Sequence, residues 1–239
     1  MKNRFGGFVI LGVSLILSSV CFGIFFYQSR MPEKTIRVVG AATQRFDSDI
    51  IKWRITIFRN AGLNNLKEGY SRIKDDMRSF VALMRENGIG AKDITVQPVN
   101  ANPVYSQYEK GGNPSGYSII QSAYLISRDL NKVEALALNP SLLADRGIML
   151  QSSNLEYYFS KLSTVKKEML AAATLDARKR ATEIAKSSGS RIAKIESARV
   201  GVFQITEPYS TEISDYGIYN TATRQKDITV TINVVFDIK

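Results

Sequence analysis

The sequence predicts an α+β fold in which antiparallel sheets pack against two long helices, preceded by one N-terminal transmembrane helix. Three observations support this prediction. The chain begins with a long uncharged apolar run, several segments alternate apolar and polar residues, and two long segments repeat apolar residues at every third or fourth position. Alternation is typical of half-buried strands, and the three-to-four spacing is typical of helices that cover one face of a sheet.

The N-terminal apolar run, residues 5–27, has no charged residue and can span about 30 Å of hydrocarbon as a helix. Because Lys2 and Arg4 precede it, the positive-inside rule predicts that the N-terminus stays in the cytoplasm and the body is exported. The lipid bilayer is therefore an expected partner. The side chains expected to contact lipid are Phe8, Ile10, Leu11, Leu15, Ile16, Leu17, Phe22, Phe25 and Phe26.

A cleaved signal peptide is the alternative to an anchor. Cys21 and Gly23 could fill the two small-residue positions of a cleavage site, but the apolar run continues beyond Gly23, which favours an uncleaved anchor. The expected division is an anchor over residues 1–30, a linker over residues 31–34 and a folded domain over residues 35–239.

Composition narrows the chemistry of this domain. Histidine is absent, which excludes Ser-His and Cys-His nucleophile pairs and histidine metal sites. The single cysteine lies in the apolar run, so the domain has no disulfide. Without Lys2, Arg4 and Arg30, the net charge of +10 falls to +7, from 29 basic and 22 acidic residues. A surplus of that size describes surface potential rather than a specific partner.

Two strands open the predicted domain, in "TIRVV" and "DIIKWRITIF", and a long helix follows them. One side of the second strand carries Ile51, Trp53, Ile55 and Ile57. The apolar stripe of the helix comprises Leu63, Leu66, Tyr70, Ile73, Met77, Phe80, Val81 and Met84. Asn87 and Gly88 end the helix, since glycine suits a left-handed C-cap. Strands in "DITVQPV" and "YSIIQSAYLI" come next, joined as a hairpin by "EKGGNPSG".

The second half of the domain has a similar order. A short helix in "DLNKVEALAL" stops before Pro140, a strand lies in "GIMLQSSNLEYYFS", and a long helix covers about residues 161–188. Strands in "RIAKIESARVGVF" and "KDITVTINVVFDI" close the chain. The long helix places Leu170, Ala173, Ala177, Ala181 and Ile184 on one narrow face, which predicts close packing on a sheet.

The same helix carries a basic cluster at residues 178–180. Asp176 lies four residues before Arg180, and Lys179 lies four residues before Glu183, so ion pairs along the helix account for most of this charge. The cluster is not an unbalanced basic strip with base-reading side chains. The sequence therefore predicts no nucleic-acid partner.

A long loop, "ITEPYSTEISDYGIYNTATR", separates the last two strands. Loops of this length are usually functional or mobile, and exposed tyrosines favour protein interfaces. This loop and the hairpin of the first half supply the candidate assembly residues. They are Tyr105, Tyr108, Tyr117, Tyr209, Tyr216 and Tyr219.

Signatures of catalysis and of metal binding are weak. Two Ser-x-x-Lys pairs and two carboxylate pairs are present: Ser71 with Lys74, Ser163 with Lys166, Asp47 with Asp49, and Asp75 with Asp76. No Lys-Thr-Gly motif accompanies the serines, and the carboxylates lack the spacing of a calcium loop, so they are expected to be solvated. We therefore expect no catalytic, cofactor-binding or metal-binding residues.

Four phrases occur in order along the chain: "IRVVGAATQRFDSDI", "LMRENGIGAKDITVQPVNANPVY", "GYSIIQSAYL" and "ATLDARKRATEIAKSSGSRIAKIES". Together they resemble the SIMPL-domain family of periplasmic immunogenic and oxidative-stress defence proteins, over about residues 34–239. The chain departs from the family at Ala42 and Phe46, where a second glycine and a proline are common, which concerns only a turn. The resemblance implies an α+β periplasmic body, no established catalytic residues, and relatives that form channel-like or cage-like homo-oligomers.

The predicted function is that of a non-enzymatic bacterial protein, anchored in the inner membrane with its body in the periplasm. It is expected to self-assemble into a ring, cage or channel-like homo-oligomer, with a link to envelope or oxidative stress. The alternative is a periplasmic ligand-binding protein or hydrolase that uses carboxylate or serine residues. The lack of histidine disfavours the hydrolase, because hydrolysis needs a general base with a tuned pKa.

Overall fold

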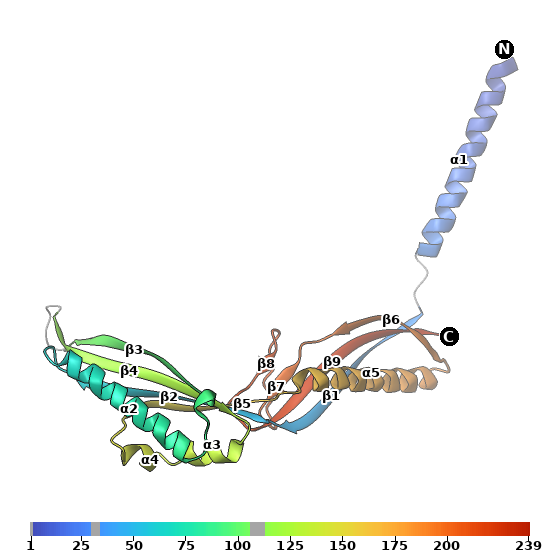
Figure 1. Ribbon diagram of the computed structural model, residues 1–239. Coiled ribbons are helices and arrows are strands. Elements are labelled where there is room, and N and C mark those ends of the chain that lie inside the picture. Colours follow the sequence, from blue (N-terminus) through green and yellow to red (C-terminus); the bar gives the residue numbers. More distant parts are fainter. Residues whose placement is uncertain (1, 30–33, 106–112) are drawn as a thin grey trace. The chain divides into compact units, whose positions relative to one another are not determined.

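The structure divides into two compact units (Figure 1). The computed structural model describes residues 2–29, 34–105 and 113–239, and in the first of these ranges the side chains of residue 9 and of residues 11–27. Unit 1 comprises Met1–Gly40, Thr174–Arg199 and Ile232–Lys239, and unit 2 comprises Ala41–Ala173 and Val200–Thr231.

The N-terminal helix, α1 (Lys2–Ser29), covers the apolar run of the sequence. Phe8 and Ile10 belong to this helix, but their side chains lie outside the described part. The other side chains expected to contact lipid are exposed: Leu11, Leu15, Ile16, Leu17, Phe22, Phe25 and Phe26. Among the described residues, no helix combines the length and the hydropathy that crossing a membrane requires.

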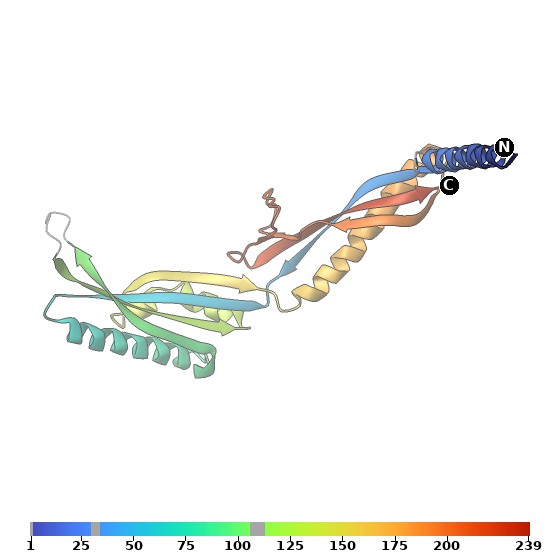
Figure 2. The same cartoon turned by 90° about the horizontal axis from the view of Figure 1, so that it is seen from above.

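Four strands form the sheet of unit 2: β2 (Ile50–Ala61), β3 (Ile94–Tyr105), β4 (Pro114–Ser127) and β5 (Leu150–Tyr158). Neighbours in the order β3-β4-β2-β5 are antiparallel, which confirms the predicted β3-β4 hairpin. The helices that lie entirely in this unit are α2 (Leu66–Glu86), η1 (Ala91–Asp93), α3 (Leu130–Ala137) and α4 (Ser141–Ala144). Helix α2 lies along one face of the sheet (Figure 2).

The core of unit 2 lies between this sheet and α2. The predicted inner side of β2 is buried at all four positions: Ile51, Trp53, Ile55 and Ile57. The rings of Trp53 and of Phe80 on α2 meet edge to face, with centroids 5.8 Å apart. Such a pair contributes about 0.5–1.5 kcal/mol beyond the burial of its area.

The start of α2 differs from the prediction. The helix begins at Leu66, so Leu63 precedes it and is exposed, and Tyr70 is exposed as well. Gly69, rather than Tyr70, faces the sheet. A Cβ atom at Gly69 would lie 2.3 Å from Cδ1 of Ile119 and 2.9 Å from Cβ of Ala61, so only glycine allows this close approach.

The second sheet has five strands: β1 (Thr35–Asp47), β6 (Ile192–Val200), β7 (Gln204–Thr206), β8 (Ile218–Tyr219) and β9 (Gln225–Ile238). Its order is β1-β9-β7-β8, and β6 also pairs with β9. The alternation predicted for β9 is confirmed, with Ile228, Val230, Ile232, Val234 and Phe236 buried. Antiparallel pairing dominates both sheets, as the predicted α+β class requires.

The long helix α5 (Leu162–Ser187) buries one line of side chains: Val165, Met169, Ala173, Ala177, Ala181 and Ala185. The three central alanines match the prediction. Leu170 is only half-buried and Ile184 is exposed, so the prediction was wrong at the ends of the face. The buried line follows steps of four residues, which turn slowly around a helix, as packing along a twisted sheet requires.

Along its surface, α5 carries an ion pair from Arg180 to Asp176 at 2.8 Å, as predicted. Glu183 pairs with Lys186 instead of Lys179, at 3.4 Å. Arg178 and Lys179 are exposed. The basic cluster at residues 178–180 is thus a partly paired, solvated face.

Candidate functional site

The second group of candidate assembly residues lies in residues 207–223, between β7 and β9, which we call the tyrosine loop. The sequence indicated an irregular segment here. In the structure it contains the short strand β8, which pairs in parallel with β7 through Gln204–Ile218 and Ile205–Tyr219. Two residues are too few to show an alternating pattern, so the sequence could not predict β8.

Arg45 of β1 holds the first end of the tyrosine loop. Its guanidinium donates to both carboxylate oxygens of Asp227, at 2.8 and 2.9 Å, and lies 4.4 Å from the centre of the Tyr209 ring. The hydrogen bond from Arg45 lowers the pKa of Asp227, and the same bond raises the pKa of Arg45. Both groups therefore stay charged at neutral pH.

Contacts to β5 and α3 hold the second end. The backbone amide of Tyr157 donates to the carbonyl of Thr221 at 2.8 Å. Arg224, just after the loop, donates to Asn131 at 2.7 Å and to Glu134 at 3.3 Å. Burial, together with a hydrogen bond to Glu134, raises the pKa of Tyr157 to about 12. The loop is thus fixed at both ends by hydrogen bonds.

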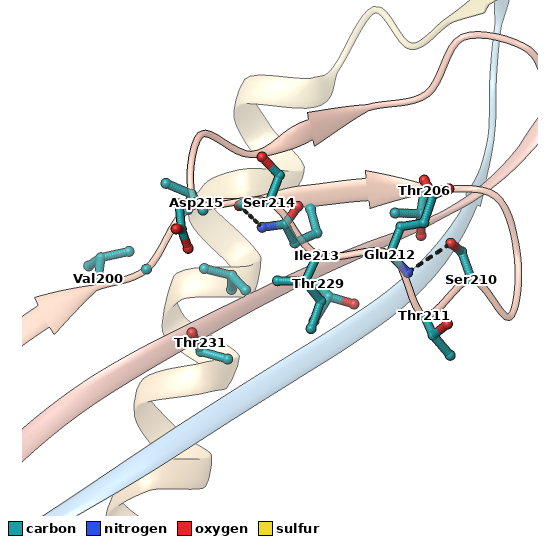
Figure 3. A pocket seen from close by; sticks show the side chains of 14 residues that line it. Val200, Thr206, Ser210, Thr211, Glu212, Ile213, Ser214, Asp215, Thr229 and Thr231 are labelled. Carbon is teal, nitrogen blue, oxygen red and sulfur yellow. Dashed lines mark hydrogen bonds between the residues drawn. The ribbon is translucent and has the colours of Figure 1, made fainter.

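Between these ends the loop presents large exposed side chains, with Ile213 83% and Tyr216 98% exposed. We call residues 211–216 the tip. Gln204 donates to the carbonyl of Ser214 at 2.7 Å, which ties the tip to β7. A hollow of about 700 Å³ lies beside the tip (Figure 3). The tip residues Thr211, Glu212, Ile213, Ser214 and Asp215 form one side of this hollow, and the rest of its lining includes Val200, Val202, Thr206 and Thr231.

The other predicted tyrosines occupy varied environments. Tyr219 packs edge to face with Tyr158, with ring centroids 6.1 Å apart. Tyr105 is exposed at the end of β3, and Tyr108 lies outside the described residues. Tyr117 lies on β4 rather than in a loop, half-buried against the core of unit 2. Within the described residues, no hydrogen bond or ring contact joins Tyr105 or Tyr117 to the tyrosine loop.

The candidates for catalysis and metal binding are dispersed. Ser71 and Lys74 are both exposed on α2. Lys166 places its Nζ 5.1 Å from the centre of the Phe203 ring. Asp49 accepts hydrogen bonds from the backbone amide and the hydroxyl of Ser160. In the parts of the chain that the structure describes, no three His, Cys, Asp or Glu side chains gather as a metal site.

Two buried charges were missed by sequence reasoning. Asp76, expected to be solvated, is buried and accepts two hydrogen bonds from Arg59. Lys226 on β9 is also fully buried, and its ammonium donates to the carbonyl of Thr223 at the end of the tyrosine loop. Burial lowers the pKa of Lys226 to about 8. The alternation of β9 could have predicted that Lys226 is buried, because this lysine lies on the same side of the strand as Ile228.

Comparison with known proteins gives a family. The sequence matches the family model "SIMPL: Protein of unknown function (DUF541)" over residues 36–236, which is most of the chain. The chain belongs to the SIMPL family. A search of curated proteins found no significant match. A crystal structure of an uncharacterized conserved protein from Listeria innocua is similar at 8% identity, covering 86% of this chain and 96% of that chain, with a TM-score of 0.22. That score is too low to indicate a shared fold.

In this SIMPL-family protein, the tyrosine loop is fixed at both ends and exposes Ile213 and Tyr216 beside a hollow. Its root contains paired charges, Arg45 with Asp227 and Arg224 with Glu134, which position the loop. The tip exposes two large side chains, Ile213 and Tyr216, next to the exposed polar residues Thr211, Glu212 and Asp215. Exposed side chains such as Ile213 and Tyr216 are suited to binding another protein surface.

Proposed function

We propose that this SIMPL-family protein self-assembles into a ring, cage or channel-like homo-oligomer through the tip of the tyrosine loop, without an enzymatic role. The observation that carries the proposal is the exposure of Ile213 and Tyr216 on a segment held at both ends. Full burial of one such side chain contributes about 1.5–3 kcal/mol. A segment that is already ordered loses little conformational entropy when it binds.

The hollow beside the tip is the surface that receives it in this proposal. Val200 and Val202 give the hollow an apolar side, and threonine hydroxyls give it hydrogen-bonding groups that suit a tyrosine. A tip that enters the hollow of a neighbouring copy makes a head-to-tail contact. Repetition of that contact by a fixed rotation closes a ring.

The proposal places the assembly on the periplasmic face of the bacterial inner membrane, with residues 5–27 as an uncleaved tether. Its support is the uncharged apolar run that follows Lys2 and Arg4. Tethering raises the effective concentration of the subunits, so modest interfaces suffice. A link to envelope or oxidative stress rests on the family resemblance alone. A mature chain that begins near Ile24, measured by intact mass, would contradict the tether.

Light scattering on the full-length protein in a mild detergent tests self-assembly. The wild type should have a protein mass of several times 26.6 kDa. The double substitution I213S/Y216S should lower that mass towards the monomer, because it removes both large side chains from the tip. Circular dichroism should be unchanged, since substitutions at such exposed positions alter stability by only about 0.5 kcal/mol.

A matched control removes two exposed leucines elsewhere in unit 2. Leu63 and Leu138 are 51% and 76% exposed, and neither lies in the tyrosine loop. The double substitution L63S/L138S should keep the wild-type mass. The proposal would be wrong if the wild type were monomeric, or if both variants lowered the mass of the assembly equally.

A further inference from the structure

Positive charge is concentrated in unit 1. Its segments at residues 34–40, 174–199 and 232–239 contain 10 basic and 4 acidic side chains, a net charge of +6 over 41 residues. Unit 2 contains 19 basic and 17 acidic side chains, a net charge of +2 over 165 residues. The surplus of the body therefore belongs mainly to its smaller unit, which creates a positive potential around that unit.

Within unit 1, a polar hollow of about 470 Å³ lies on one face of the sheet. Its lining comprises Arg37 of β1, Ser197, Ala198 and Arg199 of β6, and Asn233 and Val235 of β9. The hydrogen bond from Ile238 to the carbonyl of Lys34 sets β1 against β9 here. Because Val38 is buried, strand alternation places Arg37 on the opposite, open face.

The two arginines of this hollow lack a carboxylate partner among the described residues. Arg37 and Arg199 are both exposed, and neither takes part in an ion pair there. The carboxylate of Asp237, on the same strand as Asn233, lies 3.9 Å from the ammonium of Lys194. Two guanidinium groups without partners on adjoining parts of one sheet repel each other, so an anion between them is stabilised.

We propose that this hollow binds a phosphate group, carried either by a free anion or by a lipid headgroup. A guanidinium presents N–H groups in a planar fork that matches two oxygens of a phosphate, and two such forks can hold one group from two sides. The hydroxyl of Ser197 and the amide of Asn233 supply further donors. This site is independent of self-assembly, since its residues belong to unit 1 and the tip belongs to unit 2.

Calorimetric titration of the full-length protein in a neutral maltoside detergent tests the site at constant ionic strength. The two probes are sodium phosphate and dioctanoyl-phosphatidylglycerol mixed into the micelles. At least one probe should bind the wild type, and R37Q/R199Q should weaken that binding at least about tenfold, because hydrogen bonds to charged groups are the strong ones. Binding of both probes assigns the site to free phosphate groups in general, and binding of the lipid alone assigns it to headgroups.

The matched control is R178Q/K179Q. It also removes two positive charges from unit 1, but at exposed positions of α5 that do not line the hollow. It should weaken binding less than about twofold, since a distant charge acts only through screened potential. Equal weakening by the two double variants would show diffuse attraction and overturn the site. Failure of both probes to bind the wild type would overturn it as well.

Discussion

Lys226 offers a direct test of how the root of the tyrosine loop is built. Its side chain is fully buried, and the fall of its pKa from 10.5 to about 8 follows from that burial. Each pKa unit corresponds to about 1.4 kcal/mol, so the shift amounts to about 3 kcal/mol against the charged form in the folded protein. Between pH 7.5 and pH 9.5, which covers only part of the interval between the two pKa values, the expected change is about 2 kcal/mol.

The direction of the pH effect follows from the proton count. Between pH 8 and pH 10.5 the unfolded chain keeps the proton on Lys226, whereas the folded protein loses it. The unfolded state then binds more protons, so the free energy of unfolding rises with pH in this window. Below pH 8 Lys226 is protonated in both the folded and the unfolded state, so it no longer makes the free energy of unfolding depend on pH. The cost of burying the ammonium is therefore fully present at neutral pH.

The substitution K226M removes the titrating group and keeps an unbranched side chain in the core. Urea unfolding, followed by fluorescence of the single tryptophan, Trp53, should show a rise of about 2 kcal/mol from pH 7.5 to pH 9.5 in the wild type and none of this rise in K226M. At pH 7 the free energy of unfolding of K226M should exceed that of the wild type by less than the full cost of the buried charge. The reason is that methionine removes this charge but leaves the carbonyl of Thr223 without its donor. The pH range stops at 9.5 because the raised pKa of Tyr157, about 12, would lower stability above pH 10. Parallel pH profiles for the two proteins would refute the reasoning.

Two further substitutions test the core of unit 2, each beside a control. G69A should lower the free energy of unfolding by about 1–3 kcal/mol, because its Cβ would overlap Ile119 and Ala61, whereas G62A has open space and should change little. D76N should cost about 2 kcal/mol, because it leaves the half-buried guanidinium of Arg59 without its counter-charge, whereas D75N removes an exposed partner and should cost less than about 0.5 kcal/mol. Both pairs are measured by urea unfolding, and equal effects within a pair would contradict the packing described above.

The sequence predicted most of the secondary structure because amphipathic periods are local. The alternation in β2 and β9 and the stripe from Ile73 to Met84 in α2 each face one core, so burial follows directly from spacing. Prediction from the sequence failed where contacts between distant residues decide how far a strand extends or which side chain is buried. Strand β1 continues to Asp47, well beyond "TIRVV", because β9 pairs with it, and Gly69 replaces Tyr70 against the sheet because of its neighbours in space.

The candidate site could be predicted only in part. A tyrosine-rich loop before the last strand was visible in the sequence, and Tyr216 is indeed exposed. The anchoring of that loop could not be predicted, since Arg45 and Asp227 lie 182 positions apart in the chain. Tyr117 begins the strand that the sequence predicted, but β4 already begins at Pro114, so this tyrosine lies within the strand and is half-buried. Arg37 and Arg199 line the same hollow because β1 and β6 both pair with β9, which the sequence could not show.

Three unfavourable features of unit 2 lie at the root of the tyrosine loop. Tyr209 has a φ of 63°, the only positive value at a non-glycine residue in the described chain. Lys226 is a buried amine, and the side-chain oxygen of Gln204 is buried without a hydrogen-bond partner. Each feature opposes folding by itself, and a sequence selected for stability alone would replace each of them. Two of these residues also fix the loop, because Lys226 donates to the carbonyl of Thr223 and Gln204 donates to the carbonyl of Ser214. Local costs of this kind persist where the conformation itself is used, which favours the tip of the tyrosine loop as the functional surface of unit 2.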